Sequence, residues 1–338
     1  MIIVLKSNTT QEQAEELLAL IKSKGLEPLY LPGEERTVLG ALGDERQLAE
    51  LHFENHPYVE EVKAILSPYK KVSRELHPED TVVTVANTRF CAEDFVVIAG
   101  PCAVENEAQM QTVAKGIHAA GANLLRGGIF KPRTSPYSFQ GLGLEGLALF
   151  AKAAADNHMG TVTEVTDIEE VAQLDGKVSM FQIGARNMQN FRLLKAVGET
   201  RTPVLLKRGM AAKIDELLLA AEYIVDNGNE QVVLCERGIR TYETATRNTL
   251  DLNAVALMKQ RSHLPVVVDP SHGTGVRELV VPMAKAAVAA GADGIIVEVH
   301  PDPTVAMSDA HQQLSVPQFQ ELMHQIAPFV KAAGRSFA

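Results

Sequence analysis

Residues 96–128, VVIAGPCAVENEAQMQTVAKGIHAAGANLLRGG, contain a complete strand–helix–strand unit. The runs VVIAG and NLLRGG are short and largely apolar, and the stretch between them, EAQMQTVAKGIHAAG, has the pattern of a helix. Strands joined through a helix pair in parallel, and near-continuous apolar strands are typical of sheets buried on both faces. The segment therefore predicts one βα unit of a parallel sheet.

The same alternation continues to the end of the chain. Six further apolar runs follow, separated mainly by helical stretches: GTVTEV (160–165), MFQIGAR (180–186), PVLLKRG (203–209), VVLCERG (232–238), PVVVDPSH (265–272) and GIIVEVH (294–300). Eight strand–helix units in about 240 residues fit a closed (β/α)8 TIM barrel, which is an α/β fold. A doubly wound open sheet is the alternative architecture.

The chain before the barrel has a different pattern. Residues 1–66 predict the order β-α-β-β-α-β, with helices over 10–25 and 47–55, and that order is typical of a ferredoxin-like α+β domain. Residues 67–80, SPYKKVSRELHPED, are polar, charged and proline-bearing, so we interpret them as a linker. The catalytic barrel is then expected over 81–338, beginning with a hairpin.

The composition excludes several classes of protein. The 338 residues are 46% hydrophobic and 22% charged, which is ordinary for a globular protein with a large core. The net charge of −10 argues against a nucleic acid or an anionic membrane as partner. No apolar run approaches ~20 residues, and the N-terminus lacks a signal-peptide pattern. Three scattered cysteines do not form a disulfide framework, so a reducing cytoplasm is the expected location.

The loop after NLLRGG concentrates charge and hydroxyl groups. It reads KPRTSPY over 131–137, and its two prolines stiffen the backbone. Guanidinium groups match carboxylates and phosphates in a bidentate manner, and an ammonium group acts as a point charge. A solvated surface loop is the alternative interpretation. The rigid backbone and the mixture of Lys131, Arg133 and hydroxyl groups favour a site for a small, multiply anionic substrate.

Charged residues also follow the ends of the predicted strands: Arg126, Glu164, Arg186, Lys207, Arg208, Glu236, Arg237, Asp269, His272, Glu298 and His300. In a barrel these ends meet at one mouth, where the active sites of this fold lie. Strand ends are naturally polar, but that does not explain five or more cations gathered in an acidic protein. Like charges repel and need an anion between them. The pattern therefore predicts a site for two anionic groups, a phosphate and a carboxylate.

A metal site is a further possibility at the same mouth. Cys102 follows the first barrel strand, His272 the seventh and Glu298 ends the eighth, with Asp309 in the loop after it. A thiolate, an imidazole and two carboxylates suit divalent Mn, Fe, Co or Zn, and an open position could polarise a carbonyl oxygen. The set has no local ligand spacing, and an inert buried thiol is the alternative for Cys102.

Several motifs together resemble one enzyme family. They are KPRTSPYSFQG, AGPC, QIGARN, LLKRG, LCERGIRT, DPSH and VEVHPDP. The chain resembles the 3-deoxy-D-arabino-heptulosonate 7-phosphate (DAHP) synthases along essentially its whole length. Within them it resembles the type I subclass that is related to KDO-8-phosphate synthases and carries an N-terminal ferredoxin-like domain.

The resemblance implies the condensation of phosphoenolpyruvate (PEP) with D-erythrose 4-phosphate, which is the first step of the shikimate pathway to chorismate and aromatic amino acids. The intact K-P-R-T over 131–134 favours erythrose 4-phosphate over arabinose 5-phosphate as acceptor. Cys102 stands where metal-independent relatives would carry Asn, which implies metal dependence. The resemblance also implies feedback inhibition by tyrosine or phenylalanine bound between N-terminal domains, and a homotetramer.

The resemblance also assigns roles to individual residues. The PEP carboxylate would be held by Arg126, Lys131 and Lys207, its phosphate by Arg186 and Arg237, and the phosphate of erythrose 4-phosphate by Arg133 and Thr134. The divalent metal would be bound by Cys102, His272, Glu298 and Asp309, and the catalytic residues would be Lys131 and His272. Lys131 is the expected proton donor to the forming alkoxide, and crowding by arginines is expected to lower its pKa.

Two other functions are alternatives to this one. A KDO-8-phosphate-type synthase would use the same barrel with another acceptor sugar, and K-P-R-T argues against it. A non-catalytic sensor of phosphorylated metabolites would bind ligands without turnover, and the complete set of metal ligands argues against that.

Overall fold

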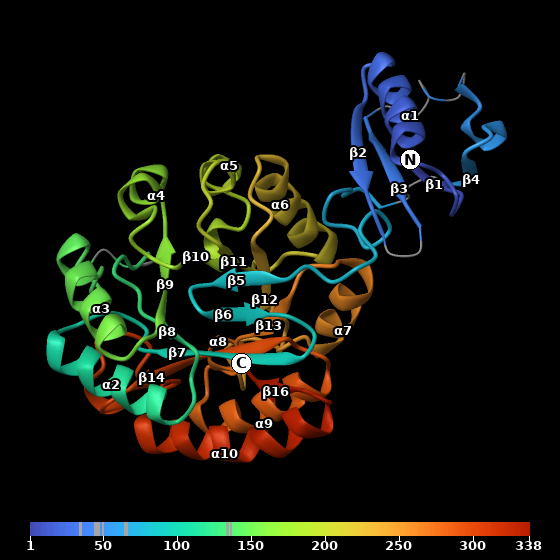
Figure 1. Ribbon diagram of the computed structural model, residues 1–338. Coiled ribbons are helices and arrows are strands. Elements are labelled where there is room, and N and C mark those ends of the chain that lie inside the picture. Colours follow the sequence, from blue (N-terminus) through green and yellow to red (C-terminus); the bar gives the residue numbers. More distant parts are fainter. Residues whose placement is uncertain (34–35, 44–47, 49–50, 64–66, 133–134, 136) are drawn as a thin grey trace. The chain divides into compact units, whose positions relative to one another are not determined.

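The computed structural model describes residues 1–33, 36–43, 48, 51–63, 67–132, 135 and 137–338. These residues form two compact units, Met1–Glu79 and Asp80–Ala338. Figure 1 traces both along the chain. Within the described residues, no helix is long and apolar enough to cross a membrane.

The first unit is a small antiparallel sheet with a helix packed on it. Its strands are β1 (Ile2–Leu5), β2 (Glu27–Leu31), β3 (Val38–Leu42) and β4 (Val59–Lys63), in the order β2-β3-β1-β4. Helix α1 (Gln11–Ser23) begins with a capping box at Thr10 and buries Ala14, Leu17 and Ile21 in one core with sheet residues. This arrangement confirms the predicted ferredoxin-like α+β domain.

The second helix predicted in this unit has a different form. Among the described residues of 47–55, the structure has no α-helix: Leu48 and Leu51 have 3-10 conformation, and Phe53–Asn55 form a 3-10 helix. His52 precedes it with a φ of +44°, in the left-handed region, which breaks any α-helix at that point. Residues 47, 49 and 50 lie outside the described part of the chain.

The second unit contains the predicted barrel. Its eight parallel strands are β7 (Asp94–Gly100), β8 (Leu124–Arg126), β9 (Gly160–Val165), β10 (Met180–Ile183), β11 (Val204–Lys207), β12 (Val232–Glu236), β13 (Val266–Val268) and β14 (Gly294–His300). Each pairs with the next, and β14 pairs with β7, from Gly294 opposite Val96 to Glu298 opposite Gly100. This last pairing closes the barrel and excludes the open sheet.

Helices surround the strands of the barrel, as Figure 1 shows. They are α2 (Glu107–Ala119), α3 (Leu144–Asp156), α4 (Ile168–Leu174), α5 (Phe191–Gly198), α6 (Ile214–Asp226), α7 (Leu252–Arg261), α9 (Arg277–Ala289) and α10 (Val316–Ala332). Shorter elements are the one-turn α8 (Pro270–Thr274), the 3-10 helices Ala185–Asn187 and Pro303–Val305, and the edge strands β15 (Leu314–Ser315) and β16 (Ser336–Phe337).

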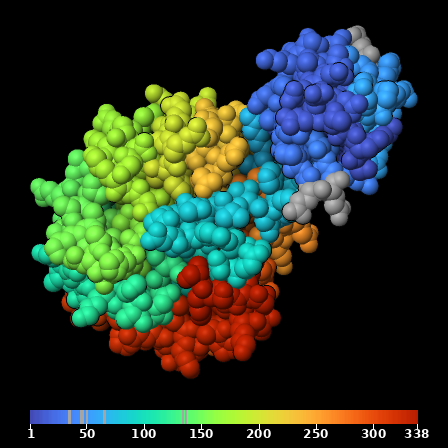
Figure 2. Space-filling model, viewed as in Figure 1, coloured from blue at the N-terminus to red at the C-terminus, as the bar shows by residue number. Residues whose placement is uncertain are grey.

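The predicted hairpin covers one end of the barrel. Strands β5 (Val83–Val85) and β6 (Thr88–Phe90) pair antiparallel, and Val83, Val85 and Phe90 share one hydrophobic core with inward-facing barrel residues. Figure 2 shows this hairpin, in cyan, over the barrel end that faces the viewer. Because the hairpin packs near the starts of the strands, the opposite end, where the strands finish, is left for a site.

Candidate functional site

A cavity of about 300 Å³ opens where the barrel strands finish. About half of the residues that line it have charged or titratable side chains: Lys131, Glu164, Arg186, Lys207, Arg237, Arg247, His272 and Asp309. Several cations from different strands therefore face one small space, as the strand-end pattern predicts. Such a cavity suits a small ligand with more than one negative charge.

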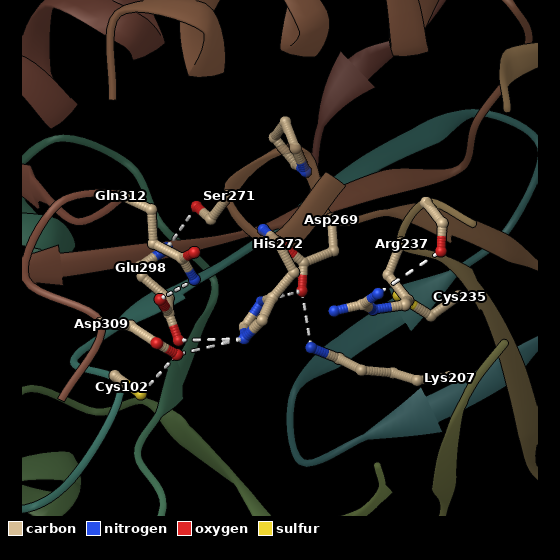
Figure 3. A network of polar contacts seen from close by, with 12 residues as sticks. Cys102, Lys207, Cys235, Arg237, Asp269, Ser271, His272, Glu298, Asp309 and Gln312 are labelled. Carbon is tan, nitrogen blue, oxygen red and sulfur yellow. Dashed lines mark hydrogen bonds and ion pairs between the residues drawn. The ribbon is translucent and has the colours of Figure 1, made fainter. Parts of the chain in front are cut away.

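The four residues of the predicted metal set lie together (Figure 3), and two of them, His272 and Asp309, line the cavity. The ligand atoms of Cys102, Glu298 and Asp309 lie within 4.8 Å of one another. His272 Nε2 lies 3.5 Å from Glu298 Oε1 and 3.8 Å from Asp309 Oδ2. Because a soft thiol, an imidazole and two carboxylates converge at these distances, the residues fit a divalent transition metal.

Asp269 orients the imidazole of His272. It caps α8 by accepting the backbone N–H of His272 at 2.9 Å, and its Oδ2 lies 2.7 Å from His272 Nδ1. Nε2 is therefore the nitrogen turned toward the other ligands, an arrangement typical of metal-binding histidines. Burial lowers the pKa of His272, and the Asp269 and Glu298 carboxylates offset this only in part. The imidazole is thus kept in its neutral, ligating form.

Glu298 is held from two sides. Arg126 Nη1 lies 2.7 Å from its Oε1, and Gln312 Nε2 donates to its Oε2 at 2.6 Å. Burial would raise the pKa of Glu298, but the neighbouring His272 imidazole and the ammonium and guanidinium groups of Lys131 and Arg126 lower it well below its usual range. The carboxylate is therefore ionised and fixed in place before any ligand binds.

Cys102 lies in a tight turn after β7. A Cβ on Gly100, whose φ is +147°, would collide with the carbonyl oxygen of Arg126, so glycine is needed for this approach. Burial and the neighbouring Glu298 raise the pKa of Cys102 to about 12. The thiol keeps its proton in the metal-free protein, so metal binding would have to displace that proton.

The predicted substrate cations occupy different environments. Lys207 lines the cavity and donates to Asp269 Oδ2 at 2.6 Å, while Arg186 and Arg237 also line it. Arg126 is buried against Glu298 and the carbonyl of Cys102, and its Nε has no hydrogen-bond partner among the described residues. A buried donor without a partner is rare in proteins and marks this guanidinium as unusual among the buried groups of the site.

Two other predicted substrate ligands, Arg133 and Thr134, lie outside the described part of the chain. Arg208, which the strand-end pattern groups with the mouth cations, is engaged elsewhere. Its guanidinium lies 2.9 Å from Glu236 and 3.0 Å from Asp251, and it holds the loop after β12 rather than serving the cavity.

The expected lowering of the Lys131 pKa is wrong. Burial does favour a lower pKa, and Arg126 adds to it, but Cys102, Glu164 and Glu298 outweigh both and raise the pKa above its ordinary value. Lys131 Nζ donates to the carbonyl of Cys102 at 3.1 Å. The ammonium is therefore protonated at neutral pH and lies beside Cys102.

Sequence reasoning missed several residues of the site. Asp269 was visible as a strand-end charge, but nothing in the sequence showed that it joins Lys207 to His272. Arg247 lies 3.3 Å from Asp309 Oδ1 and donates to Gln312 Oε1 at 2.8 Å. Arg247 sits in the middle of a long loop and not at a strand end, so no pattern identified it.

Comparison with known proteins assigns both parts of the chain to known families. Residues 82–332 match the DAHP synthetase I family, and residues 1–67 match the DAHP synthase ferredoxin-like domain. The chain belongs to the DAHP synthetase I family. Both the barrel and the N-terminal domain of this DAHP synthase family member are thus accounted for by known families.

Individual relatives within and beyond the DAHP synthases extend the match. The phospho-2-dehydro-3-deoxyheptonate aldolase of Thermotoga maritima is 48% identical over 334 residues, which cover 99% of each chain. A crystal structure of that enzyme matches with a TM-score of 0.80 and 46% identity, covering 100% of this chain and 99% of the other. A 2-dehydro-3-deoxyphosphooctonate aldolase of Syntrophobacter fumaroxidans is 32% identical, covering 69% of this chain and 86% of its own.

Proposed function

We propose that this chain condenses PEP with D-erythrose 4-phosphate to give DAHP and phosphate, the first step of the shikimate pathway, and that it requires a divalent metal. The observation that carries the proposal is the convergence of Cys102, His272, Glu298 and Asp309 beside a cavity lined by cations. It is supported by the 48% identity to the Thermotoga maritima phospho-2-dehydro-3-deoxyheptonate aldolase over 99% of both chains.

We assign the metal to Cys102, His272, Glu298 and Asp309, and the donor set suits divalent Mn, Fe, Co or Zn. When bound, the metal would supply Lewis-acid polarisation of the aldehyde oxygen. The protein prepares this position by orienting His272 through Asp269 and by holding Glu298 between Arg126 and Gln312.

The cations bring two anions together that would otherwise repel each other. Arg186 and Arg237 are assigned to the PEP phosphate, and Lys207, with Arg126 and Lys131, to its carboxylate. Arg133 and Thr134 are assigned to the phosphate of erythrose 4-phosphate. Fixing both substrates in one cavity supplies orientation and offsets their negative charge.

The condensation and the release of phosphate both require proton transfers. The PEP methylene carbon forms a bond to the aldehyde carbon, and Lys131 gives its proton to the resulting alkoxide. Water then adds to C2 of PEP, and the hemiketal phosphate loses phosphate by cleavage of the C–O bond. Glu164, a buried carboxylate that lines the cavity outside the metal set, is placed to accept the proton of that water.

The direct test is the release of inorganic phosphate. It should require both substrates, stop when a chelator removes the metal and return when a divalent metal is added. A non-catalytic sensor would instead bind PEP without consuming it under any of these conditions.

The N-terminal unit is proposed to regulate the barrel. We place the regulatory domain at 1–66, the linker at 67–80 and the catalytic barrel at 81–338, in a homotetramer whose effector is tyrosine or phenylalanine. The proposal is supported by the match of residues 1–67 to the DAHP synthase ferredoxin-like domain and by the compact unit Met1–Glu79, which also includes most of the proposed linker. It is also supported by the solved structure of a truncated DAHP synthase of Thermotoga maritima, which matches with 45% identity and covers 79% of this chain and 98% of that one.

A truncated chain that begins near Ser73 should keep turnover comparable to that of the full chain, because the site residues all belong to the barrel. The same chain should no longer respond to tyrosine or phenylalanine in the phosphate-release assay. Inhibition that survives truncation would contradict the regulatory role, and loss of turnover would indicate a stabilising role instead.

A further inference from the structure

The two loops that carry Cys102 and Asp309 are joined by side chains that are not metal ligands. Cys102 lies in the loop between β7 and α2, and Asp309 lies in the loop between β14 and β15. Asp309 has a φ of +49°, in the left-handed region that residues other than glycine adopt only when the surrounding structure holds them there. The position of Asp309 therefore depends on what fixes its loop.

The first connection is the side-chain amide of Gln313, which is fully buried. The backbone N–H of Cys102 donates to its Oε1 at 3.1 Å, and its Nε2 donates to the carbonyl of Ser308 at 2.7 Å. The Gln313 amide thus contacts the backbone of Cys102 and the backbone of Ser308, the residue directly before Asp309. Its rigid planar shape sets the distance between the two loops.

The second connection is the buried pair Glu105 and His300. His300 Nε2 lies 3.3 Å from Glu105 Oε2, and the other carboxylate oxygen accepts the backbone N–H of Met307 at 2.9 Å. The backbone N–H of Asp302 donates to His300 Nδ1 at 3.1 Å. His300 Nδ1 therefore accepts this hydrogen bond and carries no hydrogen. The ring hydrogen is on Nε2, which donates a hydrogen bond to Glu105.

We propose that Gln313 and the Glu105–His300 pair are positioning residues that hold Cys102 and Asp309 at ligand spacing before the metal binds. They therefore set the affinity of the site for the metal. This inference rests on the proposed metal site. The physical reason is that ligands already held in place lose little conformational freedom on binding, whereas two untethered loops must be ordered at that moment.

The sharpest variant is Glu105→Gln, because it changes one atom and removes no volume. A carboxylate accepts both N–H groups, but an amide presents one oxygen and one NH2 group. Whichever way the new side chain turns, its NH2 group faces either the N–H of Met307 or the Nε2–H of His300. One of the two contacts is lost in each orientation.

The experiment is a titration of the metal-free, full-length protein with Co²⁺, followed by the absorption band of a thiolate bound to cobalt. Wild-type protein should show the band, and Cys102→Ser should not. Glu105→Gln and Gln313→Leu should each raise the Kd for Co²⁺ by about tenfold. His300→Gln, which can still donate to Glu105, should raise it less than His300→Leu.

The matched control is Glu170→Gln. Glu170 is also buried, and its carboxylate also accepts two hydrogen bonds, from the N–H and the hydroxyl of Thr166 in the loop before α4. This control should leave the Kd unchanged, and circular dichroism should show every variant folded. If the wild-type band is normal and the Kd for Co²⁺ is unchanged in Glu105→Gln and Gln313→Leu, the positioning role is wrong, but the metal site still stands. A wild-type protein without a Cys102-dependent band would overturn the metal site itself.

Discussion

Cys102→Ala is expected to lower kcat by about a thousandfold or more in the presence of saturating substrates and metal. Lewis-acid stabilisation of a developing charge is worth several kcal/mol, and each ~1.4 kcal/mol corresponds to a factor of ten in rate. The loss should appear in kcat because the cavity cations to which we assign PEP remain in place. Steady-state measurement of phosphate release checks this directly.

Cys91→Ala is the control for this substitution. Cys91 is also buried, but it follows the hairpin at the opposite end of the barrel and contacts Arg89 and Asp94. Its removal should leave kcat and metal affinity at wild-type values. Comparable activity in Cys91→Ala and Cys102→Ala would contradict the assignment of Cys102 to the metal.

Replacing Lys131 is expected to have the second large effect. Lys131→Met should lower kcat by at least about a hundredfold, the usual contribution of a positioned proton donor. Lys131→Arg keeps the positive charge but cannot release a proton in the working pH range. We therefore expect Lys131→Arg to bind PEP with a KM close to wild type and yet to lose kcat like Lys131→Met.

The pH dependence gives a second check on Lys131. Because its pKa is raised, the ammonium keeps its proton throughout the neutral range and loses it only above the ordinary lysine value of about 10.4. Deprotonation of Lys131 should therefore cause no fall in kcat between about pH 7 and 9. Full activity in Lys131→Arg would show that charge alone suffices and would remove the proton-donor role.

The fold could be predicted because its signals are local. Each barrel strand is an apolar run between helical stretches, and the pairing of β14 with β7 follows once eight such runs fill a parallel sheet. The second N-terminal helix could not be predicted with the same success. The run QLAELHFEN has a helical composition, but His52 adopts a left-handed conformation that its neighbours in sequence do not reveal.

The site could be predicted in part, for a physical reason. Ligands at strand ends are visible because the barrel brings every strand end to one mouth. Their hydrogen-bond partners are not, because Gln312, Gln313 and Arg247 lie in loops whose paths no periodic pattern records. The Lys131 pKa shows the same limit. The arginine near it in sequence was apparent, but the residues that raise the pKa come from distant parts of the barrel: Cys102 from the loop after β7, Glu164 from β9 and Glu298 from β14.

The most direct test of the central claim is to compare acceptors in one assay with purified full-length protein. Phosphate release from PEP should be measured with erythrose 4-phosphate and with arabinose 5-phosphate, each with and without chelator. Our account predicts rapid release with erythrose 4-phosphate, little with arabinose 5-phosphate, and none after chelation until a divalent metal is restored. Preference for arabinose 5-phosphate, or turnover that survives complete removal of the metal, would contradict it.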